Sequence, residues 1–159
     1  MAEATFPAPV FSSKDFAKVP SQLTPDQPER LLHADVLNAD AGDSSAFSNE
    51  RQHLVRMVDL PSKIISMTLG GLKPGQSTRL HRHNYETIIY VLSGFGHSLI
   101  GGREVQWCAG DAFYVPVWAW HQHFNDSDSE QAQYIACENA PMLQNLGLAL
   151  REEACNANF

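Results

Sequence analysis

Two histidines, His81 and His83, lie two residues apart in a segment that is typical of a β-strand. Side chains at this spacing point to the same face of a strand, and their Cα atoms lie about 6.6 Å apart. Two imidazoles that close together can bind one metal ion. Both side chains could instead face solvent, so the pair alone leaves a metal site and a polar surface as alternatives.

A second cluster follows in residues 110–125, where His121, His123 and Asn125 alternate along another predicted strand. Alternation puts all three side chains on one face of that strand. If this face lines the interior of a barrel, His121 joins the first pair as a third imidazole. Three neutral imidazoles can hold iron, zinc, nickel or copper, and the ligand type alone does not select among these metals. The alternative for each histidine is a buried, hydrogen-bonded position in the core.

Two further side chains are candidates for catalysis. Arg79 shares the alternation of the first histidine pair, so it could bind a substrate carboxylate through a forked hydrogen bond, or it could reach solvent. His123 could orient a metal ligand or a substrate anion, or it could be a polar residue at the barrel mouth. His53 and His97 belong to no cluster, and we expect no chemical role for them.

The composition limits the kind of protein that could hold such a site. With 159 residues the chain has the size of one domain, which is enough to bury a hydrophobic core. Its formal net charge of -7 and the absence of a basic run argue against binding to nucleic acid or to anionic membranes. The apolar runs are too short to cross a bilayer, and the N-terminal residues lack the pattern of a secretory signal. We therefore expect a cytoplasmic protein whose partner is a small molecule or another protein.

The elements that must position the histidines occupy the second and larger part of the chain. Residues 1–50 are rich in proline and small polar residues, which predicts an extended N-terminal arm with a short helix at about 28–37. Residues 51–150 contain short runs of β-branched and aromatic residues separated by glycine-containing turns. This pattern predicts an all-β sandwich or barrel. Apolar residues at helical spacing in 142–154 predict a terminal helix.

The histidine clusters and their flanking residues resemble the two sequence motifs of the cupin superfamily. The motif residues are Gly75, His81-Arg82-His83 and Gly94 in the first motif, and Gly110, Pro116, His121 and Asn125 in the second. The resemblance covers residues 75–125, and the paired motifs at this separation are much more specific than either motif alone. It implies an all-β fold with a single cupin barrel, a double-stranded β-helix or jelly roll, that holds a metal ion on His81, His83 and His121.

The cupin pattern implies one more ligand, a glutamate seven residues before the closing glycine of the first motif. That position is Thr87, and Glu86 lies one residue earlier. A shift of one residue turns a strand side chain to the opposite face. We therefore predict that Thr87 points inward and that Glu86 is not a ligand, unless a bend at residues 84–85 turns Glu86 back.

The segment PVWAWHQHFN at 116–125 is similar to the second motif of gentisate and hydroxynaphthoate dioxygenases, which hold iron with three histidines in larger, two-barrel chains. Small three-histidine cupins that cleave β-diketones are equally similar in size. The resemblance implies an iron(II) dioxygenase, an oxidoreductase that uses dioxygen to cleave a carbon–carbon bond of a small anionic chelating substrate. Three neutral ligands do not offset the double charge of the ion, and they leave three positions of an octahedron open. Such a site suits a hydroxy-aromatic acid or an enolised diketone.

Other functions remain as alternatives. The ion could be zinc, nickel, manganese or copper, and it could act as a Lewis acid in an isomerase, lyase or hydrolase without oxygen chemistry. A metal-free barrel that binds a small ligand is a third alternative. The proline-rich arm and the exposed edge strands of a small barrel favour a homodimer.

Overall fold

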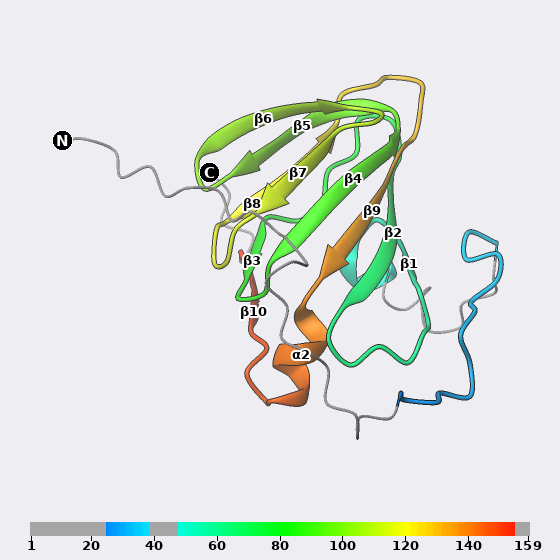
Figure 1. Cartoon of the computed structure of the whole chain (residues 1–159). Helices are drawn as coiled ribbons and strands as arrows, with labels where there is room; N and C mark the ends of the chain where they lie inside the picture. Colours follow the sequence, from blue (N-terminus) through cyan, green and yellow to red (C-terminus); the bar gives the residue numbers. More distant parts are fainter. Residues whose placement is uncertain (1–24, 39–47, 155–159) are drawn as a thin grey trace, which may run out of the picture.

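The chain folds into two antiparallel β-sheets that pack face to face (Figure 1). The structure is a computed structural model that describes residues 25–38 and 48–154. The first sheet has the strand order β1-β2-β9-β4-β7. Its strands are β1 (Leu54–Met57), β2 (Ser66–Leu72), β4 (Thr87–Ser93), β7 (Ala112–Val115) and β9 (Ala132–Glu138).

The second sheet contains both histidine motifs. It has the strand order β10-β3-β8-β5-β6, and His81 of β3 is paired with His121 of β8. Two segments that are far apart in the sequence therefore lie on neighbouring strands. The strands of this sheet are β3 (His81–His83), β5 (Phe95–Ile100), β6 (Arg103–Cys108), β8 (His121–Asn125) and β10 (Arg151–Glu153).

Alternation along the strands decides which side chains enter the space between the sheets. In β4, Ile89 and Val91 are buried, whereas Ile88 and Tyr90 are exposed. This is the pattern of a strand with one face on a core, and full burial of each large apolar side chain stabilises the fold by about 1.5–3 kcal/mol. The all-β prediction is confirmed, with two sheets in a jelly-roll arrangement. The core consists of Leu72, Ile89, Val91, Ile100, Trp107, Val115, Ala132, Tyr134 and Ala136.

A two-residue turn joins β5 to β6. Gly101 and Gly102 have φ values of 58° and 80°, a left-handed conformation that glycine adopts without steric strain. The turn sets the register of the hairpin, in which Gly96 is paired with Trp107. A side chain at Gly96 would overlap the Trp107 ring, so glycine there leaves room for the indole.

The C-terminal part differs from the sequence prediction. Helix α2 spans only Ala140–Asn145, and residues 151–153 form β10, which pairs with β3. The side chain of Asn84 explains the change, because it donates to the carbonyl of Leu148 and accepts from the amide of Leu150, each at 2.8 Å. These bonds hold an extended segment that leads into β10.

The described part of the N-terminal arm also differs from the prediction. Residues 25–38 contain no α-helix, so the helix predicted at 28–37 is absent. An ion pair of 2.7 Å between Arg30 and Asp59 ties this segment to the loop after β1. The rest of the predicted arm, at 1–24 and 39–47, lies outside the described residues. In the described part of the chain, no helix has the length and apolar character needed to span a membrane.

Candidate metal centre

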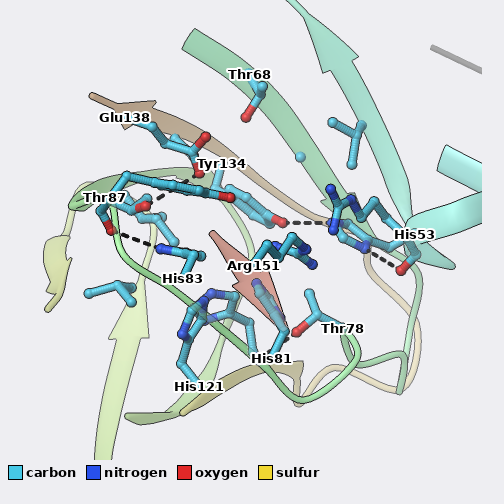
Figure 2. A pocket seen from close by; sticks show the side chains of 18 residues that line it. His53, Thr68, Thr78, His81, His83, Thr87, His121, Tyr134, Glu138 and Arg151 are labelled. Carbon is cyan, nitrogen blue, oxygen red and sulfur yellow. Dashed lines mark hydrogen bonds between the residues drawn. The ribbon is translucent and has the colours of Figure 1, made fainter. Parts of the chain in front are cut away.

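Three buried histidine side chains meet in the space between the two sheets (Figure 2). His81 and His83 come from β3, and His121 comes from β8. One nitrogen from each ring lies within 4.8 Å of the others. The ring centroids of His81 and His121 are 4.1 Å apart, because these residues are paired across the two strands. Nitrogen ligands about 2 Å from one ion lie no more than about 4 Å apart, so the nitrogens of the three rings are close to the separation that a metal requires.

The hydrogen bonds of these three rings leave one nitrogen of each free for a metal. In each ring Nδ1 lies against a backbone carbonyl, which can only accept a hydrogen bond. The proton of the neutral ring is therefore on Nδ1, and Nε2 presents a lone pair. This donor set fits a divalent transition metal. The acceptors for His81, His83 and His121 are the carbonyls of Arg79, Tyr85 and Ala119, at 2.7, 2.8 and 2.9 Å.

Burial keeps the three rings neutral. It lowers the pKa of His81 to about 3 and that of His83 to about 4, and the neighbouring His121 adds to both shifts through charge repulsion. Burial also lowers the pKa of His121. Neutral imidazole is the form that binds a metal, so the site does not need to lose protons at pH 7 before it binds an ion.

Arg82, between the two histidines of β3, holds the loop that precedes β8. Its guanidinium carbon lies 4.5 Å from the ring centroid of Trp118 and 4.6 Å from that of Trp120. The amide of Trp118 donates to the carbonyl of His83 at 2.7 Å, and Trp118 has a φ of 63°. Such a conformation costs a residue other than glycine on the order of 1 kcal/mol or more, so the surrounding contacts must hold it. The contacts of Arg82 and the hydrogen bond from the Trp118 amide together fix the start of β8 against β3.

The residues after the first histidine pair have the predicted orientation. Thr87 is buried and lines the cavity, whereas Glu86 is exposed. The Glu86 carboxylate accepts a hydrogen bond of 2.6 Å from the hydroxyl of Tyr114 on the outer face. Glu86 is therefore directed away from the three histidines, as the one-residue shift predicts.

A glutamate that the sequence analysis did not single out faces the cavity from β9. Figure 2 shows Glu138 and Tyr134 on the side of the cavity opposite His81 and His121. Burial raises the pKa of the Glu138 carboxyl, although a hydrogen bond from Thr87 opposes the shift. Gly70, paired with Tyr134 in β2, makes room for the phenol, because a Cβ there would lie 2.1 Å from it. Alternation along β9 places Glu138 on the inward face, and this pattern could have identified Glu138 from the sequence.

Of the two alternatives for Arg79, the structure has the one in which the side chain lies outside the cavity. Its side chain is partly exposed and forms an ion pair of 2.9 Å with Glu153. The alternation does not extend to Arg79 because β3 begins at His81, and it is Thr78 that is buried and lines the cavity.

Two other arginines line the cavity instead. Arg51 and Arg151 both contact Glu153, at 3.2 and 3.1 Å. With Arg79, three guanidinium groups surround this carboxylate, and Glu50 lies 3.9 Å from Arg51. The Nε–H of Arg151 is buried and has no hydrogen-bond partner within the part of the chain that the structure describes.

His123 and His53 also line the cavity. The His123 ring is 5.5 Å from that of His121, but it does not belong to the group whose ligand atoms converge in the described residues. Burial lowers the pKa of His123 well below its ordinary value. His53, for which no role was expected, lies 3.2 Å from the Tyr134 hydroxyl through Nε2. The cavity that these side chains line has a volume of about 100 Å³.

Comparison with known proteins gives related sequences. Residues 69–137 match the family model described as a cupin domain. The 5-aminosalicylate 1,2-dioxygenase of Comamonas sp is 40% identical over 84 residues, which are 52% of this chain and 21% of that protein. Gentisate 1,2 dioxygenase 1 of Aquipseudomonas alcaligenes is 35% identical over 71 residues, which are 42% of this chain and 20% of that protein. The chain thus spans about a fifth of the length of these two relatives.

A solved structure has a similar fold. A mutant of the salicylate 1,2-dioxygenase from Pseudoaminobacter salicylatoxidans, in complex with gentisate, superimposes with a TM-score of 0.60 and 19% identity. The match covers 64% of this chain and 29% of that one. At this identity the likeness shows a shared fold.

Proposed function

We propose that this protein, whose residues 69–137 match the cupin domain model, is an iron-dependent dioxygenase that cleaves a carbon–carbon bond of a small anionic aromatic substrate. One observation carries the proposal: the converging group in the described residues consists of three histidines without a carboxylate. The two dioxygenase relatives give further support.

His81, His83 and His121 would hold the ion through Nε2, and the backbone carbonyls behind them keep each ring in the orientation that presents its lone pair. Iron(II) held there would supply the one-electron chemistry that lets dioxygen react with an aromatic substrate. Because the three imidazoles are neutral, the charge of the ion is available to an anionic chelating substrate.

The wall formed by Arg51 and Arg151 binds the substrate carboxylate. Both guanidinium groups line the cavity, where they can donate charge-assisted hydrogen bonds to a carboxylate. This assignment replaces Arg79, whose side chain lies outside the cavity.

Glu138 takes up a proton from a hydroxyl group of the substrate. The Thr87 hydroxyl donates to Oε1 of Glu138, which leaves Oε2 for the transferred proton. Burial raises the pKa of Glu138, which makes this carboxylate a stronger base than a glutamate in water. The aromatic rings of Tyr85 and Tyr134 line the cavity together with Glu138.

The test is oxygen uptake by the iron(II)-loaded protein with gentisate, 5-aminosalicylate or salicylate as substrate. We expect equimolar consumption of dioxygen and substrate, and none with the zinc-loaded protein. Conversion of substrate without oxygen uptake would instead indicate an isomerase, a lyase or a hydrolase. Binding that does not require metal, with no conversion, would indicate a metal-free binding barrel.

A further inference from the structure

A chain of buried hydrogen bonds lies behind His123. The indole Nε1 of Trp107 donates to Ser98 Oγ at 2.9 Å, and Ser98 Oγ lies 2.8 Å from Nδ1 of His123. The three residues come from β6, β5 and β8, which are neighbours in the second sheet. All three are buried, with Ser98 fully enclosed, so bulk water does not compete for these bonds.

The donors and acceptors in this chain can be assigned from their chemistry. An indole N–H can only donate, so the Ser98 oxygen accepts the bond from Trp107. Within the described residues, the Ser98 hydroxyl forms these two hydrogen bonds. A buried hydroxyl proton requires an acceptor, and the remaining partner is Nδ1 of His123. Nδ1 therefore accepts, and the single proton of the neutral ring is on Nε2.

This tautomer is opposite to that of the three converging histidines. In His81, His83 and His121 the proton is on Nδ1 and the lone pair is on Nε2. In His123, Nε2 carries a proton and cannot coordinate a metal ion. The two nitrogens of an imidazole point to opposite sides of the ring. Since His123 lines the cavity and Ser98 does not, Nε2 is the nitrogen on the cavity side.

We propose that Trp107 and Ser98 are positioning residues that hold His123 as the Nε2–H tautomer, so that His123 donates a hydrogen bond to an anionic oxygen of the substrate. The inference rests on the proposed function, because it concerns the same cavity and the same anionic substrate. A neutral donor with a fixed proton stabilises the bound anion without adding a titratable charge beside the ion. It also excludes His123 as a fourth ligand, although His123 is only two residues from His121.

The experiment uses the zinc-loaded full-length protein, which needs no oxygen chemistry. Nitrogen-15 NMR of the histidine rings reports the tautomer of His123, and titration with salicylate reports anion binding. Trp107→Phe removes the donor that forces the orientation of Ser98, and Ser98→Ala removes the bond to Nδ1. Each variant should lose the fixed Nε2–H tautomer and bind salicylate about tenfold more weakly, with unchanged zinc content.

Ser77→Ala is the matched control. The Ser77 hydroxyl also accepts a hydrogen bond from a side chain of β8, that of Gln122, but Ser77 does not line the cavity. This variant should keep both the tautomer and the salicylate affinity. Thermal unfolding of all variants identifies a folding defect, and Trp107→Phe supplies an independent result if Ser98→Ala is unstable.

Two results would overturn the inference. One is a wild-type His123 ring protonated on Nδ1, and the other is unchanged salicylate affinity in a variant whose tautomer has changed. Failure of the proposed function is distinguishable from either result. An iron-loaded protein that consumes no dioxygen, but whose tautomer and salicylate affinity depend on Ser98, is not a dioxygenase and still uses His123 as a donor.

Discussion

Thr87 on β4 and Glu138 on β9 are paired across the first sheet, and the Thr87 hydroxyl donates a hydrogen bond of 3.3 Å to Glu138. Both side chains face the cavity. Thr87 of β4 stands at the position where the cupin motif has a glutamate. The carboxylate that reaches the cavity comes instead from Glu138 of β9. Within the described residues Glu138 is not part of the converging group, so its carboxylate is available to a substrate.

Thr87→Glu tests the importance of this arrangement. The new carboxylate would lie beside Glu138 and could reach the ion, which would lower the charge that attracts an anionic substrate. We expect metal content to be unchanged or higher, and turnover to fall by about 10- to 100-fold. Elemental analysis and oxygen uptake measure the two effects. Glu86→Gln is the control and should retain metal and activity, because Glu86 contacts Tyr114 on the outer face; loss of iron in this variant would contradict the account.

Arg151→Gln tests the carboxylate-binding wall. The substitution removes a charged donor that lines the cavity, so KM for an acidic substrate should rise by about tenfold or more, with metal content unchanged. Arg79→Gln removes a charge that also contacts Glu153 but lies outside the cavity, and it should have a much smaller effect. Steady-state kinetics compare the two variants. Equal increases in KM would show that the arginines act only through their general electrostatic field.

Arg82→Met tests the contacts between β3 and the loop before β8. The guanidinium lies over the rings of Trp118 and Trp120, and each such contact is worth about 0.5–2 kcal/mol. It also forms an ion pair of 2.6 Å with Glu152 of β10, which the variant loses as well. We expect the variant to lose about 1–3 kcal/mol of unfolding free energy and to release metal faster. Denaturant unfolding and transfer of metal to a chelator measure these quantities. Arg103→Met, at an exposed position of β6, should change neither; equal metal release by the two variants would contradict the role of Arg82.

The metal-free protein should lose stability as the pH falls below about 6.5. In the unfolded chain histidine has its ordinary pKa near 6.5, whereas burial lowers the pKa of His81 to about 3 and that of His83 to about 4. Between about pH 6 and pH 4 the unfolded state therefore binds more protons than the folded state. Each of the two histidines should reduce the free energy of unfolding by up to about 1.4 kcal/mol per pH unit in this window, and the slope from His83 should decrease as the pH approaches 4.

Denaturant unfolding of the metal-free protein at several pH values checks this slope. His83→Gln lacks one of the titrating groups and should give a shallower dependence. A wild-type stability that is constant from pH 7 to pH 5 would show that these rings are not held neutral by burial.

The strands and the histidine cluster could be predicted from local pattern. Alternation in residues 87–92 predicted one buried face of β4, and the same rule predicted opposite orientations for Glu86 and Thr87. The sequence motifs predicted that His121 would meet His81 and His83, and the pairing of β3 with β8 brings them together.

The rest of the cavity depends on contacts between distant segments. Residues 151–153 have no apolar alternation, and they form β10 because β3 offers a partner and Asn84 holds the preceding loop. This strand brings Arg151 to the cavity, while Arg51 comes from the segment before β1. No local sequence pattern predicts that Arg51 and Arg151 line the same cavity. Homodimerisation, a cytoplasmic location and the boundary at residue 50 stay predictions.

The metal content of single histidine variants tests the central claim most directly. His81→Ala, His83→Ala and His121→Ala should each reduce iron from one ion per chain to a small residual fraction, because two imidazoles hold a divalent ion much more weakly than three. His97→Ala is the matched control and should keep full iron content, since His97 pairs with Asp126 away from the cavity. Elemental analysis of folded, iron-loaded proteins gives the result. Full iron content in the His121→Ala protein would contradict a metal centre formed by β3 and β8.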